Sequence, residues 1–265
     1  MRFCPLYSGS SGNALFVETC GTRLLIDAGL NGRTVEEALH SIGEDARAID
    51  GILITHEHSD HILGAGVLAR RYKIPIYANE NTWQAMDGGM IGNVPLACVR
   101  VFETGRDFFI GEANVLPFPT PHDAAESVGF TIDGDFPLRR LAVMTDIGHV
   151  NGRMLDAVDG CDLLLIEANH DVNMLKVGPY PYPLKRRILG DNGHLSNESA
   201  GKALVSLYMR GLRAAVLGHL SNENNTECLA YETVRSLLRE NDIPDEEFQL
   251  GVAHRRQVGM VYEIL

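Results

Sequence analysis

The stretch "GILITHEHSDH" (residues 51–61) decides the fold, because an apolar run passes directly into a group of metal ligands. Its last six positions hold three histidines, a glutamate and an aspartate, with no lysine or arginine. Side chains two apart along a strand point the same way, so His56 and His58 can reach one cation. Asp60 and His61 follow after a turn and can line the other side of the same pocket. This spacing favours two metal ions over the alternative, a histidine-rich surface loop.

The composition is that of a globular protein, with 265 residues of which 45% are apolar and 22% are charged. No repeat and no polar linker marks a boundary, so we expect a single domain over residues 1–265. No apolar run approaches the ~20 residues needed to cross a membrane, and the N-terminal stretch lacks the apolar segment of a secretory signal. We therefore expect a cytoplasmic protein without a membrane partner. The sequence leaves the oligomeric state open.

The net charge of −12 weighs against a protein that coats nucleic acid through a broadly basic surface. Two local basic strips remain, "LKRRIL" at 184–189 and "HRR" at 254–256. Each is equally compatible with a solvated face. Five scattered cysteines without a C-x-x-C pair indicate reduced thiols rather than a disulfide framework or a zinc knuckle.

The order of apolar runs predicts a layered α+β fold. Strands are expected at 14–18 and 23–29, joined by a "CGT" turn, and a helix at 34–42 with Thr34 as its N-cap and Glu37 as its capping-box partner. The remaining expected elements are a strand at 51–55, a helix at 62–72, a strand at 74–78, a helix at 81–90, consecutive strands over 99–145, a strand at 162–168, helices at 183–189 and 197–209, a strand at 213–219, a helix at 226–240 and closing strands at 248–254 and 259–265. This order favours an αββα four-layer sandwich, two mixed β-sheets with helices on the outer faces.

Further ligands are expected at other strand ends. His122 follows "VLPFPTP", Asp146 follows "LAVMT" and His219 follows "AAVLG". Each is the first residue able to bind a metal after an apolar run. The predicted set places three histidines on one ion, an aspartate and two histidines on the other, and one bridging aspartate: His56, His58 and His122, then Asp60, His61 and His219, then Asp146. Nitrogen and oxygen donors suit Zn²⁺ or Mn²⁺.

The pattern H-x-H-x-D-H, followed by separate His, Asp and His at strand ends, resembles the metallo-β-lactamase superfamily over nearly the whole chain. The resemblance implies the αββα fold and a hydrolase with two divalent metal ions, in which a metal-bridging hydroxide attacks the substrate. It also implies that Asp60 both binds its ion and orients the nucleophile. The bridging Asp146 disfavours a true β-lactamase, while thioester and lactone hydrolases carry such a bridge and stay open as alternatives.

Three segments resemble the YycJ/WalJ/VicX branch of that superfamily: "LYSGSSGN" (6–13), "IEANHDVNML" (166–175) and "GPYPYPLKRRILGDNGHLSN" (178–197). That branch contains bacterial cytoplasmic proteins with 5′-to-3′ DNA exonuclease activity. The resemblance implies a phosphodiesterase with DNA as its substrate. A small-molecule hydrolase of the same fold, acting on a cyclic phosphodiester, a thioester or a lactone, is the alternative, and a non-catalytic regulatory module is a third.

Phosphodiester cleavage needs an acid that protonates the leaving oxygen, and a histidine held by a carboxylate suits that task. Glu167 and His194 occur in the order seen in β-CASP nucleases, which implies that Glu167 supports His194 as the acid. The alternative is a structural hydrogen bond between them. Candidate phosphate contacts come from the glycine-rich loop and from the first basic strip: Ser10, Ser11, Asn13, Lys185, Arg186 and Arg187. A tight turn would explain the same glycines.

Overall fold

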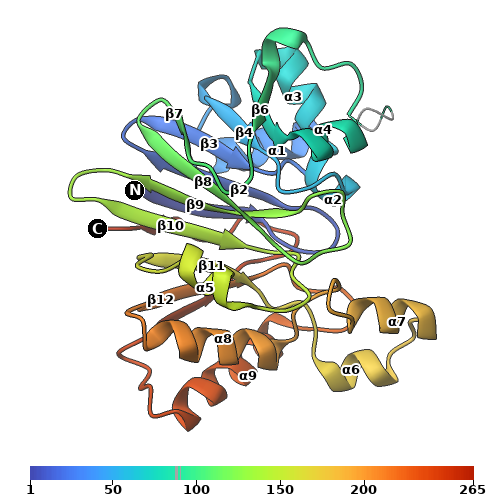
Figure 1. Cartoon of the computed structure of the whole chain (residues 1–265), viewed down its shortest axis with the longest axis vertical. Helices are drawn as coiled ribbons and strands as arrows, with labels where there is room; N and C mark the ends of the chain where they lie inside the picture. Colours follow the sequence, from blue (N-terminus) through green and yellow to red (C-terminus); the bar gives the residue numbers. More distant parts are fainter. Residues whose placement is uncertain (87–88, 90) are drawn as a thin grey trace.

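The computed structural model describes residues 1–86, 89 and 91–265, and in this part of the chain two seven-stranded sheets pack face to face (Figure 1). The first sheet has the order β14-β1-β2-β3-β4-β5-β6 and the second β13-β12-β11-β10-β9-β8-β7. The strands of the first are β1 (Arg2–Tyr7), β2 (Ala14–Thr19), β3 (Thr22–Ile26), β4 (Gly51–Leu53), β5 (Ile76–Asn79), β6 (Val99–Phe102) and β14 (Tyr262–Glu263). Those of the second are β7 (Phe108–Ile110), β8 (Ala113–Pro119), β9 (Val128–Gly134), β10 (Arg139–Met144), β11 (Leu163–Glu167), β12 (Ala214–Gly218) and β13 (Gln249–Val252).

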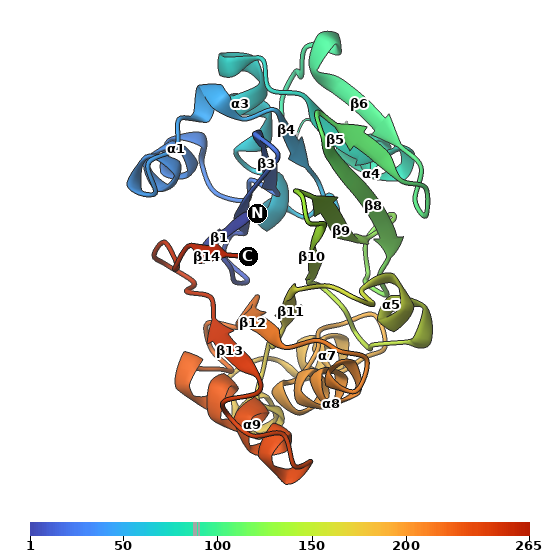
Figure 2. The same cartoon turned by 90° about the vertical axis from the view of Figure 1, so that its left-hand side faces the viewer.

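Helices cover the outer face of each sheet, as the view along the layers shows (Figure 2). The helices that follow strands of the first sheet are α1 (Gly32–Ser41), α2 (Ser59–Ile62), α3 (Ala65–Tyr72) and α4 (Glu80–Met86). Those that follow strands of the second are α5 (Gly152–Ala157), α6 (Val172–Val177), α7 (Tyr182–Ile188), α8 (Asn197–Tyr208) and α9 (Glu227–Glu240). None of the helices within the described residues is long and apolar enough to span a membrane.

The alternation of side chains along β10 shows why four layers form. Leu141 and Val143 pack into the core between the sheets, whereas Ala142 and Met144 pack against the helices of the second sheet. A strand buried on both faces needs a continuous apolar run, and "LAVM" supplies one. The predicted αββα sandwich is therefore confirmed.

The topology brings the ends of several strands to one edge. In the first sheet β3, β4, β5 and β6 run parallel, and in the second β10, β11, β12 and β13 run parallel. The two sheets touch at this edge, where the Val128 amide donates to the Thr55 carbonyl oxygen at 3.1 Å. The polar residues that follow β4, β8, β10 and β12 are consequently gathered in one place.

Several local predictions were wrong. The strand β1 was missed because Pro5 interrupts its apolar run, and the short helices α5 and α6 were missed as well. The predicted helix at 62–72 divides around Gly64, where an added Cβ would lie 2.3 Å from the Leu30 carbonyl oxygen. Of the helix predicted at 81–90, the structure describes α4 over Glu80–Met86, and residues 87, 88 and 90 lie outside the described part of the chain.

Candidate metal centre

Seven side chains converge at the shared edge of the two sheets, and all belong to the predicted ligand set. They divide into three-residue groups whose ligand atoms all lie within 4.8 Å of one another: His56, His58 and His122; Asp60, His61 and His219; and a group that joins His56 and His61 to Asp146. The first sheet contributes four of these residues, from the segment after β4. The second sheet contributes the other three, from the segments after β8, β10 and β12.

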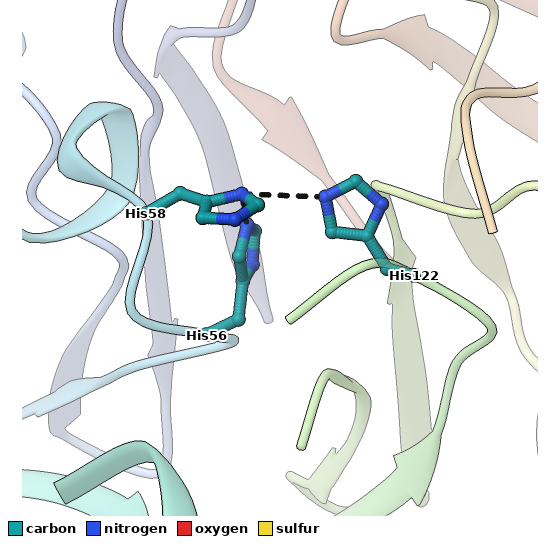
Figure 3. Close-up of side chains that lie close together, drawn as sticks. All are labelled: His56, His58 and His122. Atoms are coloured by element: carbon teal, nitrogen blue, oxygen red, sulfur yellow. Dashed lines mark hydrogen bonds between the residues drawn. The ribbon is translucent and has the colours of Figure 1, made fainter. Parts of the chain in front are cut away.

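The first group is made of three imidazole rings that face one another (Figure 3). The His58 Nδ1 atom lies 3.0 Å from His56 Nε2 and 3.3 Å from His122 Nε2. Donors held tetrahedrally at about 2.0–2.1 Å from a zinc ion stand about 3.3 Å apart. The spacing of these nitrogens therefore fits one cation.

The other nitrogen of two of these rings is engaged by an acceptor. His122 Nδ1 donates to the Gly193 carbonyl oxygen at 3.2 Å. His56 Nδ1 lies 3.0 Å from Thr55 Oγ1, a hydroxyl that itself donates to Asp27 Oδ2 and so accepts from the ring. With the proton on Nδ1, each Nε2 presents its lone pair to the centre of the group, as in other metal sites.

The second group is oriented by two buried carboxylates. His61 Nδ1 donates to Asp27 Oδ2 at 2.7 Å, and His219 Nδ1 donates to Glu167 Oε1 at 3.1 Å. The Nε2 atoms of both rings consequently point at Asp60, at 3.5 Å and 3.8 Å from its Oδ2 atom. Asp60, His61 and His219 thus present two nitrogens and one carboxylate to a second cation.

Asp146 lies between the two groups. Its Oδ2 atom is 3.4 Å from His61 Nε2, and its Oδ1 atom is 3.8 Å from His122 Nε2. Asp146 Oδ2 and His219 Nε2 are buried without a hydrogen-bond partner among the described residues. Such buried orphan atoms are rare unless something absent from the coordinates satisfies them. The residues present therefore fit two divalent cations with Asp146 as the bridge.

The backbone is strained at this bridge. Asp146 and His219 have φ of 53°, in the left-handed region that residues other than glycine rarely adopt. His219 directly follows β12, and Asp146 lies two residues after the end of β10. Strain of this kind persists only where the surrounding structure holds it, and it is common at functional sites.

The carboxylates around the second group favour protonated histidines there. Burial lowers the pKa of His219, but Asp146, Asp60 and Glu167 outweigh it and raise that pKa to about 10. Burial also lowers the pKa of His61, but the carboxylates of Asp146 and Asp27 outweigh it and raise that pKa well above its ordinary value. Protons on these rings stand in for the positive charge that cations would supply there.

The first group behaves in the opposite way. Burial, helped by the neighbouring rings of His61 and His122, brings the pKa of His56 well below its ordinary value. Burial also lowers the pKa of His122. Neutral imidazoles with free lone pairs are the form that binds metal.

The predicted partnership between Glu167 and His194 is present in the geometry. His194 Nδ1 donates to Glu167 Oε1 at 2.8 Å, while Glu167 Oε2 accepts from the amides of Ile147 and Leu195. Burial opposes protonation of His194, but Glu167 and Asp146 outweigh it and raise the ring's pKa. His194 is 17% exposed, against 0% for Glu167, so its ring lies at the rim of the centre with Nε2 available to a substrate.

The glycine-rich loop contacts the centre through Asn13. Asn13 is buried, its Nδ2 atom lies 3.1 Å from His61 Nε2, and its side chain exchanges hydrogen bonds with Gly9. Asn13 therefore holds the loop beside His61, which differs from the predicted phosphate contact. Ser10 and Ser11 are exposed.

The first basic strip lies on α7, and its three residues have different surroundings. Lys185 Nζ donates to the carbonyl oxygens of Lys176 and Gly178, which ties α7 to the end of α6. Arg187 forms an ion pair with Asp123, beside His122. Arg186 is exposed.

Sequence reasoning missed two supporting residues. Asp27 directly follows β3 and accepts hydrogen bonds from the Thr55 amide and hydroxyl, at 2.9 Å each, as well as from His61. Its signal was available, since an aspartate after "RLLI" obeys the same rule as the other strand-end ligands. Asp123 follows a predicted ligand directly, and only the fold shows that Arg187 reaches it.

Two face-to-face sheets with histidine and aspartate donors at one shared edge define the class, an αββα fold suited to binding metal ions. The chain belongs to the β-lactamase superfamily, since the sequence profile described as "Beta-lactamase superfamily domain" matches residues 22–220. It is 42% identical over 240 residues to the exodeoxyribonuclease YycJ of Bacillus anthracis, covering 91% of this chain and 90% of that protein. It is also 42% identical over 243 residues to the exodeoxyribonuclease WalJ of Streptococcus pneumoniae, with the same coverage of 91% and 90%.

A solved structure shows the same fold. The metallo-β-lactamase fold protein YhfI from Bacillus subtilis superposes with a TM-score of 0.72 and covers 98% of each chain, at 14% sequence identity. The predicted family and fold are thus confirmed by sequence and by structure.

Proposed function

We propose that this chain is a dinuclear metal-dependent phosphodiesterase that degrades DNA as a 5′-to-3′ exonuclease in the cytoplasm. The observation that carries the proposal is the ion-paired His194 beside a centre with seven donors. A thioester needs no such acid, because its thiolate departs more readily than an alkoxide. The names of the two 42% identical relatives support the same reaction.

Each donor has a role in this proposal. His56, His58 and His122 would hold the first cation, Asp60, His61 and His219 would hold the second, and Asp146 lies between the two groups. Zn²⁺ or Mn²⁺ suits these nitrogen and oxygen donors, and such a pair supplies an activated water and charge stabilisation when bound. Asp60 is 26% exposed, the most open of the carboxylates at the centre, so it can also accept a hydrogen bond from the attacking water.

The remaining step belongs to His194. Its Nδ1 proton is shared with Glu167, which leaves Nε2 to carry the proton that the departing 3′ oxygen of the sugar requires. The raised pKa of the ring keeps it protonated near neutral pH. Arg186 and Arg187 of α7, together with Ser10 and Ser11, are proposed to contact the phosphates of the strand. Lys185 and Asn13 act in this proposal by holding α7 and the glycine-rich loop in place.

The test compares leaving groups. His194→Ala should lower kcat on a 5′-labelled DNA oligonucleotide by about 10²–10⁴-fold. The loss on bis-nitrophenyl phosphate should be much smaller, because nitrophenolate departs without a proton. His149→Ala is the matched control, because His149 has no proposed role and its Nδ1 donates to the backbone carbonyl of Asp191 at 3.0 Å rather than to a carboxylate.

Two outcomes would contradict the proposal. Turnover of a thioester without cleavage of any phosphodiester, in the presence of Mn²⁺ or Zn²⁺, would make the chain a small-molecule hydrolase. Loss of bound metal in His194→Ala, measured by elemental analysis, would move His194 from the acid role to the ligand set.

A further inference from the structure

Two arginines of the segment after β13 lie close to the metal centre, although the sequence places them 35 residues or more beyond its last ligand. Arg255 Nη1 donates to the carbonyl oxygen of Ser221, two residues after His219. Arg256 Nη2 donates to Asn222 Oδ1 at 2.9 Å. The loop that follows the ligand His219 is therefore covered by a basic pair.

A second set of contacts ties Arg255 to the same part of the centre. Its side chain lies across Gly9, where an added Cβ would be 2.8 Å from Arg255 Cγ. Gly9 forms a parallel bridge with Leu220 and is bonded to Asn13, the residue beside His61. Contacts through Gly9 and through Ser221 thus both connect Arg255 to the group that would hold the second cation.

The charge of these arginines is left uncompensated. Within the described residues, neither Arg255 nor Arg256 has a carboxylate within ion-pair distance, whereas Arg187 is paired with Asp123. The nearby carboxylate of Glu227 contacts His254 instead, with Glu227 Oε2 lying 2.9 Å from His254 Nδ1. In a chain of net charge −12, two guanidinium groups that have no paired carboxylate and lie against the loop after His219 have donors available to an anion, and their planar donor arrays suit phosphate.

The two basic clusters are associated with different halves of the centre. Arg187 reaches it through Asp123 and His122, a member of the first ligand group. Arg255 reaches it through Ser221 and through Gly9, which is bonded to Asn13 beside His61 of the second group. A strand that passes over both cations would therefore meet basic residues on each side of the bond that is cut.

We propose that Arg255 and Arg256 bind backbone phosphates of the DNA strand on the His219 side of the metal centre, while α7 contacts the strand on the His122 side. The proposal rests on the proposed phosphodiesterase function and deepens it, because it makes the substrate a polymer that occupies sites beyond the scissile phosphate. A small cyclic or dinucleotide substrate would leave the pair empty.

The experiment compares a polymer with a small ester. For the double variant Arg255→Ala/Arg256→Ala, the ratio of kcat/KM on a single-stranded oligonucleotide of about 20 nucleotides to kcat/KM on bis-nitrophenyl phosphate should fall about tenfold. The slope of log KM for the oligonucleotide against log salt should fall by about 1.4, or about 0.7 for each lost phosphate contact on a single strand. Arg210→Ala/Arg213→Ala removes the same charge where the chain enters β12, at the far end of the strand from His219, and should leave ratio and slope as in the wild type.

An unchanged ratio and an unchanged salt slope in the double variant would overturn the inference. Because Arg255 packs over Gly9, its loss can also disturb folding, so Arg256→Ala alone provides the second measurement. Arg256 is exposed, and its variant should still lower the salt slope by about 0.7. A wild-type protein that cleaves neither the oligonucleotide nor the small phosphodiester would contradict the proposed function instead.

Discussion

At the scale of single residues, the centre depends on groups that orient the ligands as much as on the ligands themselves. His56, His61, His122 and His219 each have one ring nitrogen engaged by an oxygen acceptor, which fixes the tautomer that faces the cations. Asp27 is one of these acceptors, and it receives the amide and hydroxyl of Thr55 as well as His61. It should therefore matter for metal affinity although it binds no metal.

Asp27→Asn should weaken zinc binding by about 10- to 100-fold, the usual effect of losing a carboxylate behind a metal-binding histidine. The neutral amide leaves His61 less basic and free to rotate. Competition with a chromogenic chelator measures the affinity, and Asp156→Asn, at an exposed aspartate that pairs with Arg210, serves as the control. Equal zinc affinity in the two variants would show that Asp27 does not orient His61.

The burial of His170 leads us to expect that the stability of the protein depends on pH. It is 1% exposed, neither ring nitrogen has a hydrogen-bond partner in the described residues, and burial lowers its pKa to about 4. A histidine held neutral in the folded state contributes full stability above its unfolded pKa of about 6.5 and loses it as the pH falls toward 4.

At pH 5.0 the wild type should have lost roughly 2 kcal/mol of its free energy of unfolding through His170, relative to pH 7.5. His170→Leu lacks the titrating group and should lose correspondingly less over the same range. Urea unfolding of both metal-free proteins at the two pH values measures the difference. The same pH dependence in both proteins would refute the assignment.

At the scale of elements, the sequence located strand ends more reliably than it located the start of helix α1. The candidate ligands after β4, β8, β10 and β12 do lie together, because an apolar run that stops at a possible metal ligand can be recognised without knowledge of distant residues, and their role as ligands stays a prediction. The start of α1 was predicted wrongly. Asn31, not Thr34, is the N-cap and accepts from the Thr34 amide at 3.0 Å, and Glu37 pairs with Arg33 at 2.7 Å instead of closing a capping box.

Asn31→Ala should lower the free energy of unfolding by about 1 kcal/mol, because the amide of Thr34 loses its acceptor at the helix start. Thr34→Ala, inside the first turn, should cost less, since alanine is the better helix former. Chemical unfolding of the two variants compares them directly. A larger loss in Thr34→Ala would restore Thr34 as the cap.

At the scale of the whole molecule, the centre joins the two sheets. Four ligands come from the segment after β4 in the first sheet, and the other three come from the second sheet. Cations bound there would cross-link the two halves of the sandwich and would offset the negative charges of Asp60 and Asp146. The expectation of a single domain over residues 1–265 stays a prediction, and it requires one cooperative unfolding transition.

Removal of divalent metal with a chelator should lower Tm, and Zn²⁺ or Mn²⁺ should restore it. At a free metal concentration 100-fold above Kd the stabilisation is about 2.7 kcal/mol per site. Scanning calorimetry measures the shift, and elemental analysis should give two ions per chain. A single bound ion, or a Tm indifferent to the chelator, would contradict a dinuclear centre that cross-links the sheets.

The sequence by itself determined the layer order of the fold and the choice of seven candidate donors, because strand periodicity and ligand spacing are local properties. The tertiary structure alone placed Asp27 behind His61, Asp123 beside Arg187, and Arg255 over Gly9. It also turned Asn13 and Lys185 inward to supporting positions. The contacts of Asp27 with His61, of Asp123 with Arg187 and of Arg255 with Gly9 join residues 34 to 246 positions apart. A pairing at that separation depends on how the sheets pack rather than on any pattern in the neighbouring residues.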